Sequence, residues 1–248
     1  MQVVLLAAGL GSRLGALTKD IPKALINVAG KPLMFHALEF AARLRAAKVL
    51  VVGGYGFSLV ARALDQGRTC NPALAGLAFE LIENPSFRDG NLISLLAARP
   101  RLDQGFLLLN VDHIYRPGVA AVVAPDATDV TAFIDTDRSL GADDMKVERG
   151  SDGRVRRISK TLTKFDAGYV GMTRVPSCAL PRYWQTADAA LAEEGRAIHV
   201  ERILGRLAEG DTAPLCRDIS GHGWLEVDTA EERAAAEQAL LARPLENS

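Results

Sequence analysis

A short apolar run, Val3–Ala7, leads directly into a glycine-rich segment that extends from Ala8 to Gly15. Uninterrupted valine and leucine residues are typical of a strand buried on both faces of a parallel sheet. Glycines at the carboxyl end of such a strand let backbone N–H groups approach phosphate oxygens, because no Cβ stands in the way. These residues therefore predict the first strand of an α/β fold with a phosphate-binding turn behind it.

The spacing of the glycines in this segment differs from the two most familiar phosphate loops. A Rossmann G-x-G-x-x-G fingerprint would need glycine where Leu14 stands, and a Walker A loop would need Gly-Lys in place of Leu14-Gly15. A dinucleotide-dependent dehydrogenase is therefore disfavoured. Arg13 lies within the loop and Lys23 follows a proline shortly after it, a pair of cations suited to a triphosphate. We predict Arg13 at the β- and γ-phosphates and Lys23 at the α-phosphate.

Apolar runs and amphipathic segments alternate through the first half of the chain. This alternation is typical of a parallel sheet covered by helices on both faces. We therefore predict an α/β fold with a doubly wound, mostly parallel, Rossmann-like mixed sheet. Further strands are expected over Val49–Gly53, Leu77–Glu83 and Phe106–Val111, and helices over Pro32–Ala47, Phe57–Leu64 and Leu92–Ala98.

The pattern changes after about Asp135, where a small substrate subdomain of a β-hairpin and helices is expected. The dipeptide Asp152-Gly153 favours a tight hairpin. We interpret residues 1–248 as one domain, with a nucleotide-binding half (1–135) and an acceptor-binding half with a C-terminal helix (136–248). Strands are expected over Lys146–Glu148, Val155–Ile158 and Gly168–Thr173, and helices over Arg182–Glu194, His199–Ala208 and Ala230–Ala242.

Two aspartates follow apolar stretches that lie far apart in the sequence. Asp112 comes directly after Phe106–Val111, and Asp228 follows Trp224–Val227. Ligands of open α/β sheets sit outside the carboxyl ends of the strands, so Asp112 is expected beside the glycine loop. Mg²⁺ prefers a few carboxylates together with substrate phosphate oxygens, and Asp112 and Asp228 are predicted as its ligands. Taken singly, each aspartate could equally cap the turn or helix that follows it.

Charge and cysteine content exclude several classes of partner. Twenty-nine Lys and Arg residues face 30 Asp and Glu residues, so no overall basic field favours nucleic acid or an anionic membrane. Three widely spaced cysteines form neither a disulfide framework nor a zinc motif. We expect neither a signal peptide nor a membrane span, because the N-terminal apolar run is short and no other apolar run approaches about 18 residues. This composition predicts a cytoplasmic protein.

The string L-A-A-G-x-G-S-R-L-G at Leu6–Gly15, followed by P-K-A-L at Pro22–Leu25, resembles the signature of the sugar nucleotidyltransferase family. D-H-I-Y at Asp112–Tyr115 and W-x-x-V-D-T at Trp224–Thr229 are similar to the metal-binding segments of cytidylyltransferases that act on small alcohol phosphates, above all inositol 1-phosphate. The resemblance spans nearly the whole chain. It departs at Ala167, where the family usually has a small hydroxylated or thiol residue. The chain is also expected to lack the membrane phosphotransferase domain that is fused to some inositol members.

The resemblance also implies which residues bind the nucleotide. Amide and hydroxyl groups can read a pyrimidine edge, a role it gives to Asn91 and Ser94, although both could simply cap a helix. Arg13 and Lys23 take catalytic roles. The full nucleotide-binding set is Leu6, Ala7, Ala8, Gly9, Gly11, Ser12, Arg13, Lys23, Asn91, Ser94 and Asp112.

Candidates for the acceptor site fall in the second half. An incoming phosphate needs a cation, and Lys146 and Lys160 lie on the predicted hairpin, although both could be solvated strand lysines. Asp166 could accept hydrogen bonds from acceptor hydroxyls or cap a turn. The four histidines lack ligand-like spacing and are interpreted as packing or surface residues, with His113 alone beside the predicted metal. Aromatic residues near Asp166 and Glu226 leave open a cage for a choline-like cation.

Together these features predict an enzyme that transfers the cytidylyl group of CTP to a small phosphorylated alcohol, first of all inositol 1-phosphate, and releases pyrophosphate with Mg²⁺. The acceptor could instead be choline phosphate, an aminoalkylphosphonate or a sugar 1-phosphate, the last with UTP or dTTP. A non-catalytic nucleotide-binding regulator is the alternative of another class, and retention of both cations and both aspartates argues against it. The prediction allows a homodimer and a membrane CDP-alcohol phosphotransferase that acts downstream.

Overall fold

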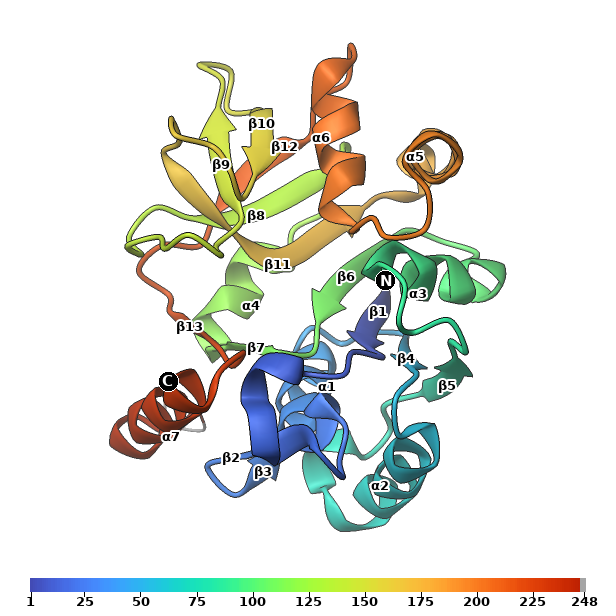
Figure 1. The fold of residues 1–248 in the computed structure, drawn as a ribbon, viewed down its shortest axis with the longest axis vertical. Coiled ribbons are helices and arrows are strands. Elements are labelled where there is room, and N and C mark those ends of the chain that lie inside the picture. Colours follow the sequence, from blue (N-terminus) through green and yellow to red (C-terminus); the bar gives the residue numbers. More distant parts are fainter. Residues whose placement is uncertain (246–248) are drawn as a thin grey trace.

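A nine-stranded mixed sheet runs through the computed structural model, which describes residues 1–245 (Figure 1). Its strands are β1 Gln2–Ala7, β4 Lys48–Gly53, β5 Phe79–Glu83, β6 Phe106–Asn110, β8 Thr131–Asp135, β9 Lys146–Arg149, β10 Val155–Ser159, β11 Ala167–Val175 and β12 Leu215–Asp218. The order is β10-β9-β11-β6-β1-β4-β5, with β8 beside β11 and β12 beside β8. The run β6-β1-β4-β5 is parallel, whereas β11 is antiparallel to β6, β8 and β9.

Two short ribbons and seven α-helices complete the fold of residues 1–245. One ribbon pairs β7 (His113–Tyr115) with β13 (Trp224–Glu226), and the other pairs β2 (Asn27–Val28) with β3 (Lys31–Pro32). The helices are α1 Leu33–Arg43, α2 Phe57–Cys70, α3 Asn91–Ala98, α4 Pro117–Val123, α5 Leu180–Glu194, α6 Glu201–Glu209 and α7 Ala230–Ala242. Short 3-10 segments occupy Ser12–Thr18, Lys23–Leu25, Pro72–Leu74, Arg99–Arg101 and Ser177–Ala179.

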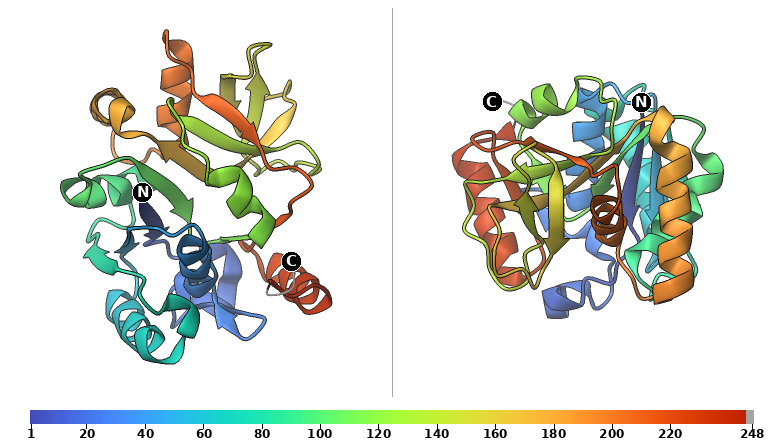
Figure 2. Two further views of the ribbon diagram at one scale, coloured as in Figure 1. Left: turned by 180° about the vertical axis from the view of Figure 1, so that it is seen from behind. Right: turned by 90° about the horizontal axis from the view of Figure 1, so that it is seen from above.

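Helices cover both faces of the sheet, as the apolar strands require (Figure 2). Every residue of β1 is buried, and its alternate side chains enter different cores. Val3 and Leu5 pack with α1, α2 and α4, whereas Val4 and Leu6 pack with α3, α5 and α6. The predicted doubly wound α/β architecture is therefore confirmed.

The boundaries of some elements differ from the predicted ones for local reasons. The first helix ends at Arg43 because Arg45 adopts a positive φ of 53°. The second continues to Cys70, and Gly67 within it lets the ring of Phe35 approach so closely that a Cβ there would lie 2.7 Å from the ring. The elements β2, β3, β7, β8, β12, β13 and α4 were not predicted.

The second half of the chain is joined to the first half through the same sheet. β11 lies directly against β6, pairing Met172 with Leu109. The C-terminal segment returns through β13 to pair with β7. Helix α7 then packs Ala236 and Leu240 against Leu14 of the glycine loop region. The C-terminal segment therefore helps to position the loop.

Candidate functional site

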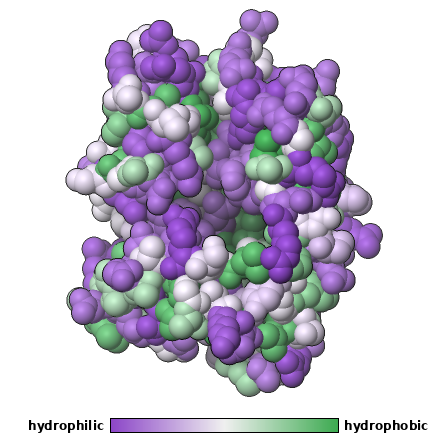
Figure 3. Space-filling view, viewed as in Figure 1, coloured by the Kyte–Doolittle hydropathy of each residue, from purple (hydrophilic) through white to green (hydrophobic). Residues whose placement is uncertain are grey.

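A cavity of about 330 Å³ opens at the carboxyl ends of β1 and β6. Ala8 and Gly9 line it directly after β1, and Asn110 and Asp112 line it at the end of β6. The space-filling view shows this hollow between the upper and lower parts of the molecule, with many hydrophilic residues around it (Figure 3). Ligands of open α/β sheets bind at this position, outside the carboxyl ends of the strands.

The glycine loop forms one wall of the cavity. Gly11 has a φ of +67°, and a Cβ there would lie 2.9 Å from the Cβ of Lys23, so glycine is needed to leave that lysine in place. A Cβ on Gly9 would meet no atom within 4 Å, so the backbone at Gly9 is open to the cavity. Ala7 is buried and lines neither this cavity nor an adjoining one of about 240 Å³. The other predicted nucleotide-binding residues line one or both of these cavities: Leu6, Ala8, Gly9, Gly11, Ser12, Arg13, Lys23, Asn91, Ser94 and Asp112.

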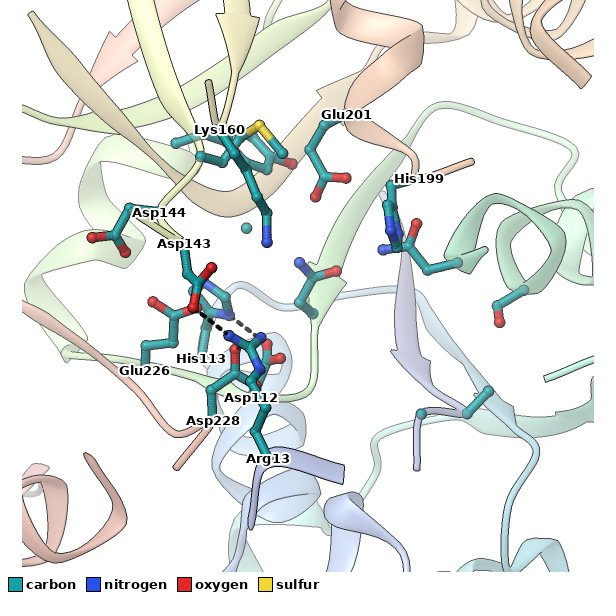
Figure 4. Close-up of a pocket in the computed structure, with 18 of the residues that line it drawn as sticks. Arg13, Asp112, His113, Asp143, Asp144, Lys160, His199, Glu201, Glu226 and Asp228 are labelled. Carbon is teal, nitrogen blue, oxygen red and sulfur yellow. Dashed lines mark hydrogen bonds and ion pairs between the residues drawn. The ribbon is translucent and has the colours of Figure 1, made fainter. Parts of the chain in front are cut away.

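Lys23 lies between the two aspartates predicted to bind metal. Its side chain is only 7% exposed; Nζ is 2.7 Å from Oδ2 of Asp112 and forms a second ion pair with Asp228. Arg13 also pairs with Asp228, and it lies 3.7 Å from Asp143 across the cavity (Figure 4). The structure therefore brings together the four charged groups that the sequence singled out at distant positions.

The pKa shifts in this cluster follow from burial and mutual charge. Burial by itself raises the pKa of Asp112, but the charges of Lys23 and His113 lower it more, so the pKa is far below its usual value. Burial lowers the pKa of Lys23, while Asp112 and Asp228 raise it to a net value above the usual one. Burial also lowers the pKa of His113, and Asp112 raises it more. Asp112 is therefore ionised and Lys23 charged at neutral pH.

The donor chemistry of the two aspartates fits a divalent metal. Asp112 follows β6 and Asp228 follows β13, yet their carboxylates share one cation, the ammonium of Lys23. Carboxylate oxygens are the protein ligands that Mg²⁺ prefers, completed by substrate phosphates and water. Within residues 1–245, no group of three or more His, Cys, Asp or Glu residues could hold a metal by itself. Two carboxylates suit an ion that also takes oxygens from a bound triphosphate.

Asn91 and Ser94 both reach the cavity, but each also bonds to the protein. Oδ1 of Asn91 accepts a hydrogen bond from the backbone N–H of Val200 at 2.8 Å. Oγ of Ser94 accepts from Nδ2 of Asn84 at 2.9 Å. The Asn91 amide N–H₂ and the Ser94 hydroxyl hydrogen are the groups left to read a base, and this role stays a prediction.

The three predicted acceptor residues have different surroundings. Lys160 lines the cavity opposite Arg13 and Asp112 (Figure 4). Lys146 is buried, and its ammonium donates to the backbone carbonyls of Gly141 and Lys160 at 2.7 and 2.9 Å. Asp166 accepts from the backbone and the guanidinium of Arg149, and like Lys146 it is absent from the cavity lining. Of the three, the structure therefore brings only Lys160 to the site.

Further carboxylates and histidines, outside the predicted set of site residues, complete the lining of the cavity. Burial raises the pKa of both Glu201, at the start of α6, and Glu226, in β13. Glu226 could have been found in the sequence, because it stands two residues before Asp228 within the Trp224–Thr229 segment. Glu201 carried no such signal, since α6 reaches the cavity only through tertiary packing. The added lining residues include Asn110, His113, Asp143, Asp144, His199, Glu201 and Glu226.

A site of this kind is expected in an enzyme that transfers a nucleotidyl group, and comparison with known proteins agrees. The chain belongs to the family of MobA-like NTP transferase domains, whose family model matches residues 3–207. The predicted membership of a nucleotidyltransferase family is thereby confirmed. Asp228 and α7 lie beyond the matched residues.

Two curated relatives and one solved structure are similar over almost the whole chain. The "Bifunctional IPC transferase and DIPP synthase" of Rubrobacter xylanophilus is 30% identical over 240 residues, which are 95% of this chain and 51% of that protein. The "CMP-5'-(3-aminopropyl)phosphonate synthase" of Streptomyces rubellomurinus is 37% identical over 262 residues, which are 96% of this chain and 38% of that protein. The inositol-1-phosphate CTP transferase from T. maritima has the same fold, with a TM-score of 0.78, 17% identity and 96% of each chain covered.

The chain thus spans about half the length of the first of these curated relatives, and less of the second. None of the helices within residues 1–245 is both long and apolar enough to cross a membrane.

Proposed function

We propose that this chain transfers the cytidylyl group of CTP to inositol 1-phosphate, giving CDP-inositol and pyrophosphate. The observation that carries the proposal is the convergence of Lys23, Asp112 and Asp228 at the glycine loop, beside a polar acceptor side of the same cavity. The names of the R. xylanophilus relative and of the T. maritima structure support this pair of substrates.

The reaction needs no general base. The second pKa of a phosphate monoester is about 6, so the acceptor is largely dianionic at neutral pH. One of its oxygens attacks the α-phosphorus of CTP, a new O–P bond forms, and the bond to the β-phosphate oxygen breaks as pyrophosphate leaves. Catalysis then depends on bringing two polyanions into line and on neutralising their charge.

The cations of the site match these two tasks. Lys23 is held at the loop by its two ion pairs, and we assign it to the α-phosphate, where charge develops. Arg13 is half-exposed at the cavity edge, and we assign it to the β- and γ-phosphates. Lys160 faces them from the acceptor side and would bind the incoming phosphate. A Mg²⁺ ion held by Asp112 and Asp228 would neutralise further charge on the α-phosphate.

The acceptor side of the cavity suits a polyol. Carboxylates of Glu201, Glu226 and Asp144 line it and can accept hydrogen bonds from several hydroxyl groups. The same carboxylates could instead bind an ammonium group, and the S. rubellomurinus relative is named for an aminopropylphosphonate product. Cytidylyl transfer to an aminoalkylphosphonate is therefore the second candidate function.

The test is pyrophosphate release by the purified chain with Mg²⁺. CTP, UTP, dTTP and ATP would each be combined with inositol 1-phosphate, choline phosphate, 3-aminopropylphosphonate and glucose 1-phosphate, and Asp112→Asn would be the inactive control. Turnover with CTP and inositol 1-phosphate, lost in the variant, is expected. Faster turnover with the aminophosphonate would support the second candidate function instead. If nucleotide binds but no pair of substrates reacts, the proposal that the chain is an enzyme is refuted.

We also propose that the CDP-alcohol is consumed by a membrane CDP-alcohol phosphotransferase. A CDP-alcohol carries an activated phosphodiester, so a second transferase can displace CMP from it with another alcohol. Adding CDP-inositol to membranes of the source organism and following CMP release would test this step.

A further inference from the structure

The two oxygens of the Asp112 carboxylate have different partners. Oδ2 accepts from Nζ of Lys23 at 2.7 Å, and Oδ1 accepts from Nδ1 of His113 at 2.5 Å. An ionised carboxylate has only acceptors, so the hydrogen of this second bond resides on Nδ1. His113 therefore fixes the rotation of the carboxylate from the side opposite to the lysine.

The ring of His113 is closely packed by its neighbours. The indole of Trp224 stacks on it with 5.2 Å between ring centroids and 6° between planes. Gly171 lies against the ring, where a Cβ would be 2.7 Å from both Cε1 and Nε2. The His113 side chain is 6% exposed, so the imidazole has little freedom to turn.

Trp224 is itself held in place. Its Nε1 donates to Oδ2 of Asp135 at 2.7 Å, and the guanidinium of Arg138 lies 4.6 Å from its ring centroid. The same ribbon fixes the other aspartate, because Val227 N–H donates to the carbonyl of Asp112 at 2.9 Å, one residue before Asp228. The stack and the ribbon thus set Asp112 and Asp228 relative to each other.

We propose that His113 is a positioning residue, which holds the Asp112 carboxylate in the orientation that binds the metal and triphosphate. The proposal rests on the function proposed above for the site. Carboxylate ligands of metals are commonly oriented by hydrogen bonds from neighbouring side chains, and loss of such a partner costs roughly 10–100-fold in metal affinity or activity. Nothing in the role requires His113 to touch the acceptor.

Two conservative substitutions distinguish the roles of the two ring nitrogens. In His113→Asn the amide N–H₂ takes the place of Nδ1, whereas in His113→Gln it takes the place of Nε2. We expect His113→Asn to keep the Mg²⁺-dependent affinity for CTP within a few-fold of the wild type. His113→Gln and His113→Leu should weaken that affinity by roughly 10–100-fold, and raise the Mg²⁺ concentration needed for half-maximal turnover by a similar factor, with KM for the acceptor unchanged.

Affinity would be measured by calorimetric titration of CTP in Mg²⁺ and in EDTA, without acceptor. His36→Leu is the matched control, because His36 is also buried and bonds to the carbonyl of Val28 at 3.0 Å, away from the cavity. This variant should lower the melting temperature and leave the Mg²⁺ dependence unchanged.

Rescue by His113→Gln rather than His113→Asn would overturn the proposal, since it would assign the role to Nε2. Equal behaviour of all three His113 variants would also overturn it. If His113→Leu does not fold, the comparison of Asn with Gln still decides. The binding measurement is independent of turnover, so a wild type that binds Mg²⁺ and CTP but transfers nothing would refute the proposed function while the His113 variants still test this inference.

Discussion

On the nucleotide side of the cavity, the charged groups are paired with one another, whereas on the acceptor side two of them are free. Lys23 contacts Asp112 and Asp228, and Arg13 contacts Asp228. Lys160 and Glu201 face the same cavity, and within residues 1–245 neither side chain forms an ion pair. The first side holds its geometry without a substrate, and the second has its hydrogen-bonding capacity available for one.

This difference predicts how the two sides respond to substitution. Removing a group from the paired side leaves charges without partners inside the protein, which costs folding free energy as well as activity. Removing a group from the free side should change recognition of one substrate and leave the fold intact.

Lys23→Met should have the largest effect. It leaves Asp112 and Asp228 without their shared buried cation, at a cost of about 3 kcal/mol in unfolding free energy, and removes a phosphate-binding charge, which should lower kcat by roughly 10²–10³-fold. Urea denaturation and pyrophosphate release would measure the two effects. Loss of activity without loss of stability would contradict the paired arrangement.

Lys160→Met should have an intermediate effect that is confined to the acceptor. A charge-assisted hydrogen bond is worth about 1.5–3 kcal/mol, so KM for the phosphorylated acceptor should rise on the order of 10–100-fold while KM for CTP and the melting temperature stay constant. Lys164→Met is the matched control, because that lysine is 80% exposed and does not line the cavity. An equal rise in both KM values would show that the two sides do not divide the substrates between them.

Glu201→Gln should have the smallest effect, on the pH dependence of stability. Burial raises the pKa of Glu201 in the folded state, so ionisation of this carboxyl disfavours folding. Above the folded pKa, the wild type is destabilised by a buried ionised carboxylate, and the neutral glutamine of the variant avoids this cost. Below the unfolded pKa of about 4.3, the side chain at position 201 is neutral in both proteins. The variant should therefore melt roughly 1–2 °C higher at pH 8, and the difference should vanish near pH 4. A higher melting temperature for Glu201→Gln at acid pH, rather than at pH 8, would contradict the assigned sign.

The same contrast explains how much the sequence could predict. Phosphate binding depends on the backbone, and a backbone that must approach a ligand needs glycine at fixed places, as Gly11 shows by its φ and its contact with Lys23. Such requirements produce a sequence motif that can be recognised without a structure. Asp112 was predicted for a similar reason, because it follows a buried strand, and the carboxyl ends of such strands in an α/β sheet lie at the ligand-binding edge.

The residues on the acceptor side of the cavity form no comparable sequence motif. Lys146 and Lys160 occupy one hairpin, but β9 and β10 pair with a shift in register between Val155 and Arg157, so the sequence could not say which lysine faces the cavity. Lys146 faces the other way and binds the carbonyls of the 141–144 turn. Glu201 reaches the site from a helix more than a hundred residues beyond the glycine loop, through contacts that exist only after folding.

The place of β11 in the sheet limits how such a protein can be re-engineered. Because Ala167–Val175 lies hydrogen-bonded between β6 and the hairpin, a fragment that stops near Asp135 would expose one whole edge of β6 to solvent. Exchange of the second half between relatives, as a cassette, would replace a central strand of the core together with the acceptor residues. Changing the substrate preference should therefore be easier by single substitutions of residues that line the cavity than by exchanging the second half of the chain between relatives.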